Sequence, residues 1–500
     1  MGSKNNKGLQ DIPQAGFFGH PKGLLTLFFT EFWERFSYYG MRAILLFYMY
    51  YEISEGGLGL NITTATSIMA IYGSLIYMSG VIGGWIADRL IGTSQTVFYG
   101  GILIMLGHIA LAIPADGMSM LLISIALIVI GTGLLKTNVS TVVGDLYSME
   151  DKRRDSGFNI FYTGINIGAL IAPIVVGTLG QKYNFHLGFG VAAIGMFIGL
   201  VMFIVTRPKY MGSVGRNVPN PLTNEEKGKV FKTIFVSAII IAALVSAGVK
   251  FGLLTVDIFT ILVSVLAVIL PVIYFTIMFR SPKTSKEERA RLATYIPLFI
   301  AAVIFFAILE QGSIILARFA DQRTQLSFAG FELQSSWFQS LGAFFIVIFA
   351  PIFAWLWMKL RDRQFSTTRK FSLGLFFAGF SYLILMLPGL MKGTEVLASP
   401  LWLVFSFFLI SIGELFISPI GLSATTKLAP AAFASQTMSL WFLANAAGQG
   451  INAQIVRLFT PDTEVLYFGV IGLLSLILGF ILYVISPKIR HLVEAKNNAA

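Results

Sequence analysis

Long apolar segments, separated by short polar stretches, repeat along the whole chain. Most have about 18 to 25 residues and the first is longer, so each is long enough for an α-helix to cross a hydrocarbon core of about 30 Å. Fourteen membrane spans are therefore predicted, with boundaries read from the sequence. They are residues 23–51, 64–87, 96–113, 118–141, 157–177, 188–206, 230–249, 257–279, 294–316, 335–358, 371–390, 400–420, 437–456 and 465–485.

The spacing of these segments divides the chain into parts. Six spans come first, a polar stretch and two further spans follow, and six more spans complete the chain. The pattern predicts an all-α polytopic membrane protein made of two six-helix bundles with two extra transmembrane helices between them. The predicted parts are an N-terminal bundle (1–206), a cytoplasmic linker with the extra pair (207–292), a C-terminal bundle (293–486) and a cytoplasmic tail (487–500).

Composition and charge agree with a membrane protein. Of 500 residues, 56% are hydrophobic and only 12% are charged. The net charge of +11 does not indicate nucleic acid, because about 27 of the 36 Lys and Arg residues fall on one side of the predicted spans. We expect that side to be cytoplasmic, so that both termini lie in the cytoplasm. The protein is then expected to be a multi-pass protein of the bacterial cytoplasmic membrane, in contact with its lipid.

Other chemistry is largely excluded by residue counts. There is no cysteine, so disulfides and thiol chemistry are ruled out, and four scattered histidines form no ligand cluster. No nucleophile, metal or phosphate-binding constellation is present. We expect no cofactor and no enzymatic activity. The first apolar segment carries charges and is too long for a signal-peptide core, so we expect it to be a span rather than a cleaved signal.

Seven charged residues stand out inside the predicted spans, where a charge is costly and usually marks a functional cavity or a partner. The acidic ones are Glu31, Glu34, Glu310 and Glu414, and the basic ones are Arg35, Arg42 and Lys136.

The first span concentrates such residues on one face. At about 100° per residue, a single helical face carries Glu31, Glu34, Arg35, Tyr38, Tyr39 and Arg42. A titratable cluster of this kind in a wet cavity suggests proton coupling. The alternative is a set of buried ion pairs that only hold helices together.

The remaining charged residues lie on corresponding spans of the two predicted halves. The charged spans are the first and fourth of each half, and transporters built from parallel repeats bind their substrate near the membrane midplane between the halves. By depth, Arg42 can pair with Glu310 in the outer half, and Lys136 with Glu414 at the middle or inner level. Two such pairs at different depths can act as gates. Pro419, close to Glu414, is a candidate bend.

Several motifs resemble a known family. The segment from Gly84 to Gly92, with Asp88 and Arg89, resembles the loop motif of the major facilitator superfamily. The run from Glu31 to Arg42 is similar to the first-helix motif of the proton-dependent oligopeptide transporters (POT family). Further matches over nearly the whole chain are Gly16-Phe-Phe-Gly-His-Pro, Gly83-Gly-Trp-Ile-Ala-Asp-Arg89, Phe161-Tyr-Thr-Gly-Ile-Asn166-Ile-Gly168, Glu310-Gln-Gly-Ser and Gly413-Glu-Leu-Phe-Ile-Ser-Pro419. The chain looks most like the di- and tripeptide carriers of Gram-positive bacteria.

The resemblance implies a major facilitator fold and the alternating-access import of di- and tripeptides with protons. We expect the protein to work as a monomer. The resemblance also implies proton coupling by Glu31, Glu34, Arg35 and Glu310. Peptide contacts would come from Arg35, Tyr39, Tyr77, Lys136, Asn166, Glu310, Glu414 and Trp441, with Tyr38 and Phe306 also near the pocket. Gating would involve Arg42 with Glu310, and Lys136 with Glu414 and Pro419.

Three positions depart from the family pattern: Thr137 stands where proline is common, Gly342 where asparagine is common, and Leu309 where a second glutamate is common. Two other functions remain open. One is a proton-coupled carrier of the same fold for another solute, such as an amino acid, nitrate or a drug. The other is a peptide-sensing receptor or membrane enzyme.

Overall fold

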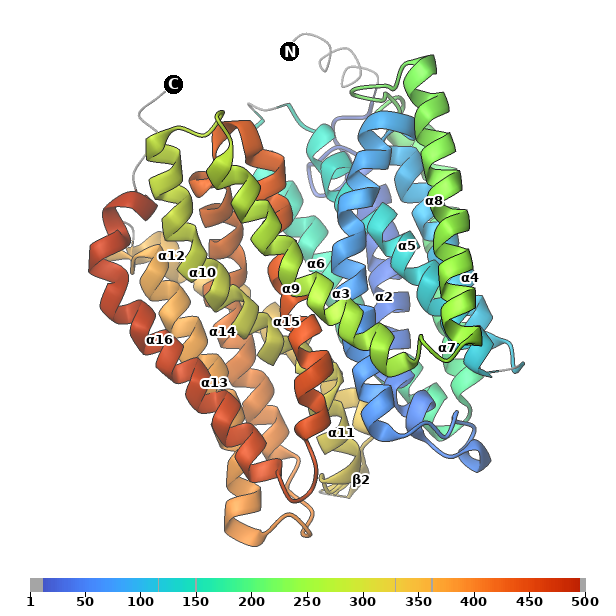
Figure 1. The fold of residues 1–500 in the computed structure, drawn as a ribbon, viewed down its shortest axis with the longest axis vertical. Coiled ribbons are helices and arrows are strands. Elements are labelled where there is room, and N and C mark those ends of the chain that lie inside the picture. Colours follow the sequence, from blue (N-terminus) through green and yellow to red (C-terminus); the bar gives the residue numbers. More distant parts are fainter. Residues whose placement is uncertain (1–11, 116, 149–150, 329, 361–362, 495–500) are drawn as a thin grey trace. The chain divides into compact units, whose positions relative to one another are not determined.

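The computed structural model describes residues 12–115, 117–148, 151–328, 330–360 and 363–494. Within these residues fourteen helices have 20 or more residues, nine from α2 to α10 and five from α12 to α16 (Figure 1). They overlap all fourteen predicted spans, so the predicted all-α polytopic architecture is confirmed. A two-stranded hairpin of β1 (Ser327–Phe328) and β2 (Phe331–Glu332) is a minor addition that the hydrophobic pattern did not predict.

The helices up to the extra pair are α2 (Gly23–Tyr50), α3 (Ile62–Ile86), α4 (Thr93–Ala112), α5 (Gly117–Asp145), α6 (Arg154–Lys182), α7 (Phe185–Tyr210), α8 (Asn224–Lys250) and α9 (Val256–Arg280). Those that follow are α10 (Lys286–Glu310), α11 (Ile315–Gln322), α12 (Ser340–Leu360), α13 (Thr367–Lys392), α14 (Leu401–Leu428), α15 (Ala434–Ile455) and α16 (Glu464–Glu494).

Short 3-10 helical turns and one π-helical turn among the described residues join or extend several of these elements. They are η1 (Ile53–Glu55), η2 (Ala87–Ile91), η3 (Gln311–Ser313), η4 (Ser335–Gln339), η6 (Ala431–Phe433) and η7 (Val456–Leu458).

Eleven candidate membrane spans in the described part of the chain are long and apolar enough to cross a membrane. Helices α2, α8 and α15 are not among the eleven. Buried polar side chains interrupt two of these three, namely Glu31, Glu34 and Arg35 on α2, and Asn445 and Gln449 on α15. Low mean hydropathy in these two helices therefore reflects polar groups placed inside the protein.

Contacts among Cα atoms divide the chain into two compact units. Unit 1 comprises Met1–Tyr38, Ser79–Gly168 and Phe189–Val263, and unit 2 comprises Tyr39–Met78, Ala169–Gly188 and Ser264–Ala500. The boundaries fall inside α2, α3, α6, α7 and α9. This division follows contacts and not the order of helices, so the predicted order of bundles along the sequence remains a prediction.

Unit 1 is held together by close helix packing. Helices α4 and α5 lie side by side (Figure 1). A Cβ atom added at Gly100 would lie 2.7 Å from the carbonyl oxygen of Gly131, and one at Gly131 would lie 2.7 Å from that of Gly100. Only residues without side chains allow two helix backbones to approach this closely. The fully buried Ile104 and Leu135, from the same two helices, belong to the adjoining hydrophobic core.

Unit 2 contains a comparable contact between α13 and α16. The Ser372 hydroxyl donates to the Gly479 carbonyl at 2.7 Å, and the Ser475 hydroxyl donates to the Leu375 carbonyl at 2.8 Å. Because both hydroxyls are fully buried, each needs an acceptor inside the protein, and each finds a backbone carbonyl on the facing helix.

Helix α10 shows how local sequence sets an element's ends. Ser285 accepts a hydrogen bond from the Glu288 backbone N–H at 3.2 Å, and the Glu288 carboxylate accepts one from the Ser285 N–H at 2.8 Å. This reciprocal capping box begins the helix. The sequence predicted one span over 294–316, but α10 ends at Glu310 and the turn η3 separates it from α11.

The break after α10 is held by the Gln311 side chain. Its amide oxygen accepts from the hydroxyls of Tyr382 at 2.9 Å and Tyr467 at 2.8 Å, and its amide nitrogen donates to Asn452 at 2.9 Å. These partners come from α13, α16 and α15. Three helices thus fix the residue that follows Glu310.

Gly83 and its neighbour Gly84 allow a stability test. A Cβ at Gly83 would lie 1.9 Å from the Gly133 carbonyl oxygen, whereas one at Gly84 would have no atom within 4 Å. Gly83→Ala is expected to lower the free energy of unfolding by about 1–3 kcal/mol through overpacking. Gly84→Ala should be neutral or stabilising, because alanine favours helix. Denaturation of the two purified variants measures the difference, and equal stabilities would contradict the packing argument.

Candidate functional site

A buried cluster of charges lies on α2 in unit 1. The Nε atom of Arg35 lies 2.7 Å from Oε1 of Glu31 and 2.8 Å from Oε2 of Glu34. All three residues are at most 3% exposed. The spacing of three and four residues predicted one shared face, and the structure places the three side chains together.

One guanidinium serves two carboxylates in this cluster. Among the described residues, no hydrogen-bond donor reaches Oε2 of Glu31 or Oε1 of Glu34. Buried carboxylate oxygens are normally satisfied by donors. The cluster can therefore take up a proton or a cationic group without first giving up a hydrogen bond.

The other predicted site residues of unit 1 lie on α5, α6 and α2. Lys136 is half-buried on α5 and acts electrostatically on Glu34. Asn166 is buried on α6 and donates to the Tyr162 carbonyl at 2.9 Å. The Arg35 guanidinium lies 5.8 Å from the centre of the Tyr38 ring, a favourable cation–π distance.

A second cluster surrounds Glu310 in unit 2. Arg42 donates to Oε2 of Glu310 at 2.5 Å, as the predicted outer pair requires. The Tyr77 hydroxyl donates to Oε1 at 3.3 Å, and the Asn445 amide donates to the same atom at 3.0 Å. Helices α2, α3 and α15 thus each contribute one donor to a carboxylate at the end of α10. A buried carboxylate with this set of donors is well stabilised as an anion.

Asn445 was not predicted from the sequence. It is 4% exposed, and its amide oxygen accepts a hydrogen bond from Gln449 at 3.4 Å. That bond directs the nitrogen of Asn445 toward Glu310. The available signal was the polar series Asn445, Gln449 and Asn452, whose spacing of four and three residues puts a polar stripe on an otherwise apolar span.

The remaining predicted residues of unit 2 lie on α14, α15, α10 and α2. Glu414 is half-buried and lies within electrostatic reach of the Glu310 carboxylate. The Trp441 ring packs edge-on against Phe306, with centroids 5.4 Å apart. A Cβ at Gly421 would lie 1.9 Å from the Trp441 ring, so the ring sits directly on the α14 backbone. In the same unit, Pro419 is exposed and Tyr39 is half-buried.

Further contacts close the end of unit 2 that is predicted to face outside. The hydroxyls of Tyr50 and Tyr51 both donate to Asp321, and Ser335 donates to it at 2.9 Å. Nearby, Gln181 donates to Ser335 at 2.7 Å. The ends of α2 and α6 are therefore tied to α11 and η4.

Helix α3 is also tied to α15 near this end. The Ser67 hydroxyl donates to the Ala453 carbonyl at 3.1 Å, and Ser74 donates to that of Ala446 at 2.9 Å. Within unit 2, the ends of α2, α3 and α6 that are predicted to face outside are thus closed against helices of the second half.

The predicted inner pair is not tested. Lys136 belongs to unit 1 and Glu414 to unit 2, so their pairing remains a prediction. In the part of the chain that the structure describes, no group of three or more His, Asp or Glu residues could hold a metal ion.

The three residues that depart from the family pattern lie on α5, α12 and α10. Helix α5 continues through Thr137, whose hydroxyl donates back to the Gly133 carbonyl at 3.2 Å. A Cβ added at Gly342 on α12 would meet no atom within 4 Å, so a side chain at this position would enter open space. Leu309 leaves Glu310 as the carboxylate at the end of α10.

These features define a class of protein. Membrane-spanning helices carry buried charged side chains that pair with one another, as in secondary transporters. The chain belongs to the POT family, whose model matches residues 94–474. It is therefore a multi-pass membrane protein of a transporter family, and not an enzyme.

Similar proteins cover nearly the whole chain. The transporter YclF of Bacillus subtilis is 61% identical over 98% of this chain and 99% of its own length. The di-/tripeptide transporter of Lactococcus lactis subsp. cremoris is 49% identical over 95% of this chain and 97% of its own. A crystal structure of a mutant of a peptide transporter POT in complex with alafosfalin is 59% identical, with a TM-score of 0.95 over 98% of this chain and 100% of that one. The predicted family and fold are confirmed.

The buried pair of Arg42 and Glu310 gives a second test of stability. Arg42→Gln and Glu310→Gln should each cost about 3 kcal/mol of unfolding free energy, because each leaves a buried charge without its partner. The double variant should cost less than the sum of the two by about 1–3 kcal/mol. Denaturation of the purified variants measures this.

The ion pair of Arg89 and Glu226, 3.4 Å apart and exposed, supplies a control. Glu226→Gln should leave stability almost unchanged, since exposed pairs contribute little. Strict additivity of the Arg42 and Glu310 substitutions would show that the two side chains do not stabilise each other.

Proposed function

We propose that this protein is a proton-coupled symporter that imports di- and tripeptides by alternating access. Membership of the POT family and the names of its close relatives support peptide transport. The observation that carries the proposal is the pair of buried charge clusters, one at Glu31, Glu34 and Arg35 and the other at Arg42 and Glu310. Each cluster changes its net charge when one carboxylate takes a proton.

Glu310 is the proposed proton-controlled latch of the outer gate. As an anion it accepts hydrogen bonds from Arg42, Tyr77 and Asn445. Protonation removes the charge that attracts Arg42 and converts one carboxylate oxygen from acceptor to donor. The contact between α2 and α10 then weakens, and the outer end can open.

The α2 cluster is the proposed coupling site for proton and substrate. A zwitterionic peptide has a carboxylate at one end and an ammonium group at the other, and needs a charge of opposite sign at each. We assign the peptide carboxylate to Arg35 and Lys136 and its amino end to Glu414. When the carboxylate engages Arg35, that guanidinium is drawn away from its acidic neighbours, Glu31 and Glu34. Their uncompensated charge favours proton uptake, which couples binding of peptide to binding of a proton.

The remaining assignments follow the same scheme. Tyr39, Tyr77, Asn166 and Trp441 shape the peptide pocket, and Lys136 with Glu414 forms the inner gate near Pro419. The coupling proton is the sole ion required and no cofactor takes part. We place the protein as a monomer in the lipid of the bacterial cytoplasmic membrane, with both termini in the cytoplasm. The charge balance of the loops supports this orientation.

Gradient dependence tests the coupling. The purified protein in liposomes should accumulate a labelled dipeptide when the outside is acidic relative to the inside, and should stop accumulating it when an ionophore collapses the gradient. Equal uphill accumulation with and without the gradient would refute proton coupling. Competition by Ala-Ala against a labelled candidate substrate tests the substrate class, because uptake by a carrier for another solute would not fall when Ala-Ala is added.

Glu34→Gln tests the role of the α2 cluster. The substitution keeps the size of a side chain that is 0% exposed but cannot take up a proton. We expect gradient-driven uptake to fall by at least about tenfold, the effect of roughly 1.4 kcal/mol, while exchange of labelled for unlabelled peptide continues. Glu226→Gln, an exposed change of the same chemistry, should leave both activities intact. Full gradient-driven uptake by Glu34→Gln would remove this residue from the coupling mechanism.

A further inference from the structure

The end of α10 leaves backbone groups that need partners. Carbonyls in the last turn of a helix have no N–H four residues further on, and within a membrane such groups must be satisfied inside the protein. The Asn452 side chain donates to the Ala307 carbonyl at 2.8 Å, and the Ser313 hydroxyl donates to the Glu310 carbonyl at 3.3 Å. Side chains from outside α10 therefore stabilise the end that carries Glu310.

The orientation of the Gln311 amide follows from its partners. A backbone carbonyl can only accept a hydrogen bond, so Ala307 determines which end of the Asn452 amide is the nitrogen. The oxygen of Asn452 then accepts from the nitrogen of Gln311 at 2.9 Å. The oxygen of Gln311 accepts from the hydroxyls of Tyr382 and Tyr467, at 2.9 and 2.8 Å. No other orientation of the two amides keeps all of these hydrogen bonds.

The four side chains of Gln311, Asn452, Tyr382 and Tyr467 are here called the Gln311 network. All four are at most 6% exposed. Water cannot easily replace a lost partner at such a depth, so each missing bond leaves a buried polar group unsatisfied. A fully satisfied network of this kind holds its members in one arrangement.

Hydrogen bonds matter more than packing at this end of α10. A cavity of about 480 Å³ lies beside it, and Ala307, Ile308 and Gln311 are among the residues that line the cavity. Side chains that face a cavity lack van der Waals contacts on that side. The Gln311 network is therefore the main restraint on the position of the break.

Helix α15 contacts both residues at the break. Asn445 donates to the Glu310 carboxylate, and Asn452 accepts from the Gln311 amide. The two asparagines are seven residues apart, which places them on one face of α15 with about 10 Å between them along the axis. A shift of Gln311 against α15 would therefore also change the distance between Glu310 and its donor Asn445.

The surroundings of the Glu310 carboxylate are sensitive to small shifts. The Tyr77 hydroxyl donates to it at 3.3 Å, already long for an O–H···O bond, so a displacement of a few tenths of an ångström would break this contact. Arg42 from α2 and Asn445 from α15 donate at 2.5 and 3.0 Å. Arg42 favours the carboxylate anion, whereas Glu414 from α14, within electrostatic reach, disfavours it. The position of Glu310 among these groups thus decides how readily it takes up a proton.

We propose that Gln311 is a positioning residue for transport. Through the Gln311 network it holds Glu310 within reach of Arg42, Tyr77 and Asn445, and it thereby sets the external pH at which the outer end of the protein opens. Gln311 itself binds neither proton nor peptide. This inference rests on the proposed function, in which protonation of Glu310 releases the outer gate.

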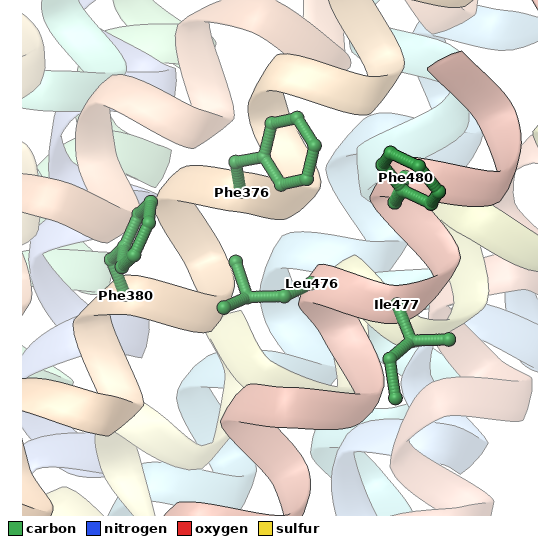
Figure 2. Close-up of a pocket in the computed structure, with 5 residues that line it drawn as sticks. All are labelled: Phe376, Phe380, Leu476, Ile477 and Phe480. Carbon is green, nitrogen blue, oxygen red and sulfur yellow. The ribbon is translucent and has the colours of Figure 1, made fainter. Parts of the chain in front are cut away.

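The helices that supply the two tyrosines also provide control positions. A groove between α13 and α16 is lined by apolar side chains, namely Phe376, Phe380, Leu476, Ile477 and Phe480 (Figure 2). No member of the Gln311 network lines this groove. Phe380 of α13 is 51% exposed, and Tyr483 of α16 is 47% exposed. Substitutions at these two positions change the same helices without removing a bond of the network.

The test measures uptake of a labelled dipeptide into liposomes over a series of external pH values at a fixed internal pH. Gln311→Met keeps the length of the side chain but removes its donor and its acceptor. We expect the external pH of half-maximal uptake to rise by about half a unit, a roughly threefold change in proton affinity, because a displaced Glu310 loses donors and is protonated more readily. Tyr382→Phe and Tyr467→Phe each remove one donor and should give smaller shifts in the same direction. The controls Tyr483→Phe and Phe380→Leu should keep the original profile.

An unchanged profile, or one shifted to lower pH, would overturn the positioning role, even if the maximal rate falls. If Gln311→Met fails to fold, the two Tyr→Phe variants of the network decide the matter by the same criterion.

A second measurement separates this inference from the proposed function. Absence of gradient-driven uptake by the unsubstituted protein would refute the proposed function, and thermal unfolding then tests the positioning role alone. Glu310→Gln should lower the melting temperature of Gln311→Met by about half as much, or less, as it lowers that of the unsubstituted protein, because the carboxylate has already left its donors. Equal lowering in the two backgrounds would overturn the inference whether or not the protein transports peptides.

Discussion

A charge inside a membrane protein must be given a partner, and this requirement governs how the described helices are arranged. Glu310 at the end of α10 is met by Arg42 from α2, Tyr77 from α3 and Asn445 from α15. No single helix could satisfy this carboxylate. Three helices must therefore converge on the break after α10, and Gln311 holds the break in place from the opposite side with bonds to three further side chains. The polar contacts thus determine which helices are neighbours at this level.

Small residues make these contacts reachable. Gly73 of α3 lies directly against Gln449 of α15, where a Cβ would come within 2.0 Å of its amide oxygen. Gly168 of α6 lies against the Phe32 carbonyl of α2, and Gly421 of α14 lies under the Trp441 ring. Without side chains at these positions the helix backbones approach closely, so short polar groups can meet across the interface. Glycine here supports the polar site and is more than a flexible element.

The two charge clusters differ in a way that suits different tasks. At Glu310 both carboxylate oxygens accept hydrogen bonds, so the anion is well stabilised, as the proposed latch requires. At Glu31 and Glu34 a single guanidinium serves two carboxylates, and some of their oxygens lack a donor among the described residues. Such a cluster responds readily to a proton or to a ligand charge. Arg42 of the proposed latch and the cluster of Glu31, Glu34 and Arg35 lie on the same helix, α2, which gives the proposed coupling a physical route.

The sequence by itself determined the fourteen spans and the polar face of α2, and depth along the spans made Arg42 and Glu310 a possible pair that the structure then brings together. Each of these depends on periodicity, hydropathy or depth along a single helix, which the order of residues encodes directly. Only the tertiary structure decided the break after Glu310, the donors Tyr77 and Asn445 on that carboxylate, the closure by Asp321, and the difference between Gly83 and its neighbour Gly84. Periodicity shows which face of a helix is polar or small, but not which distant helix that face meets. The identity of the partner depends on how the helices pack.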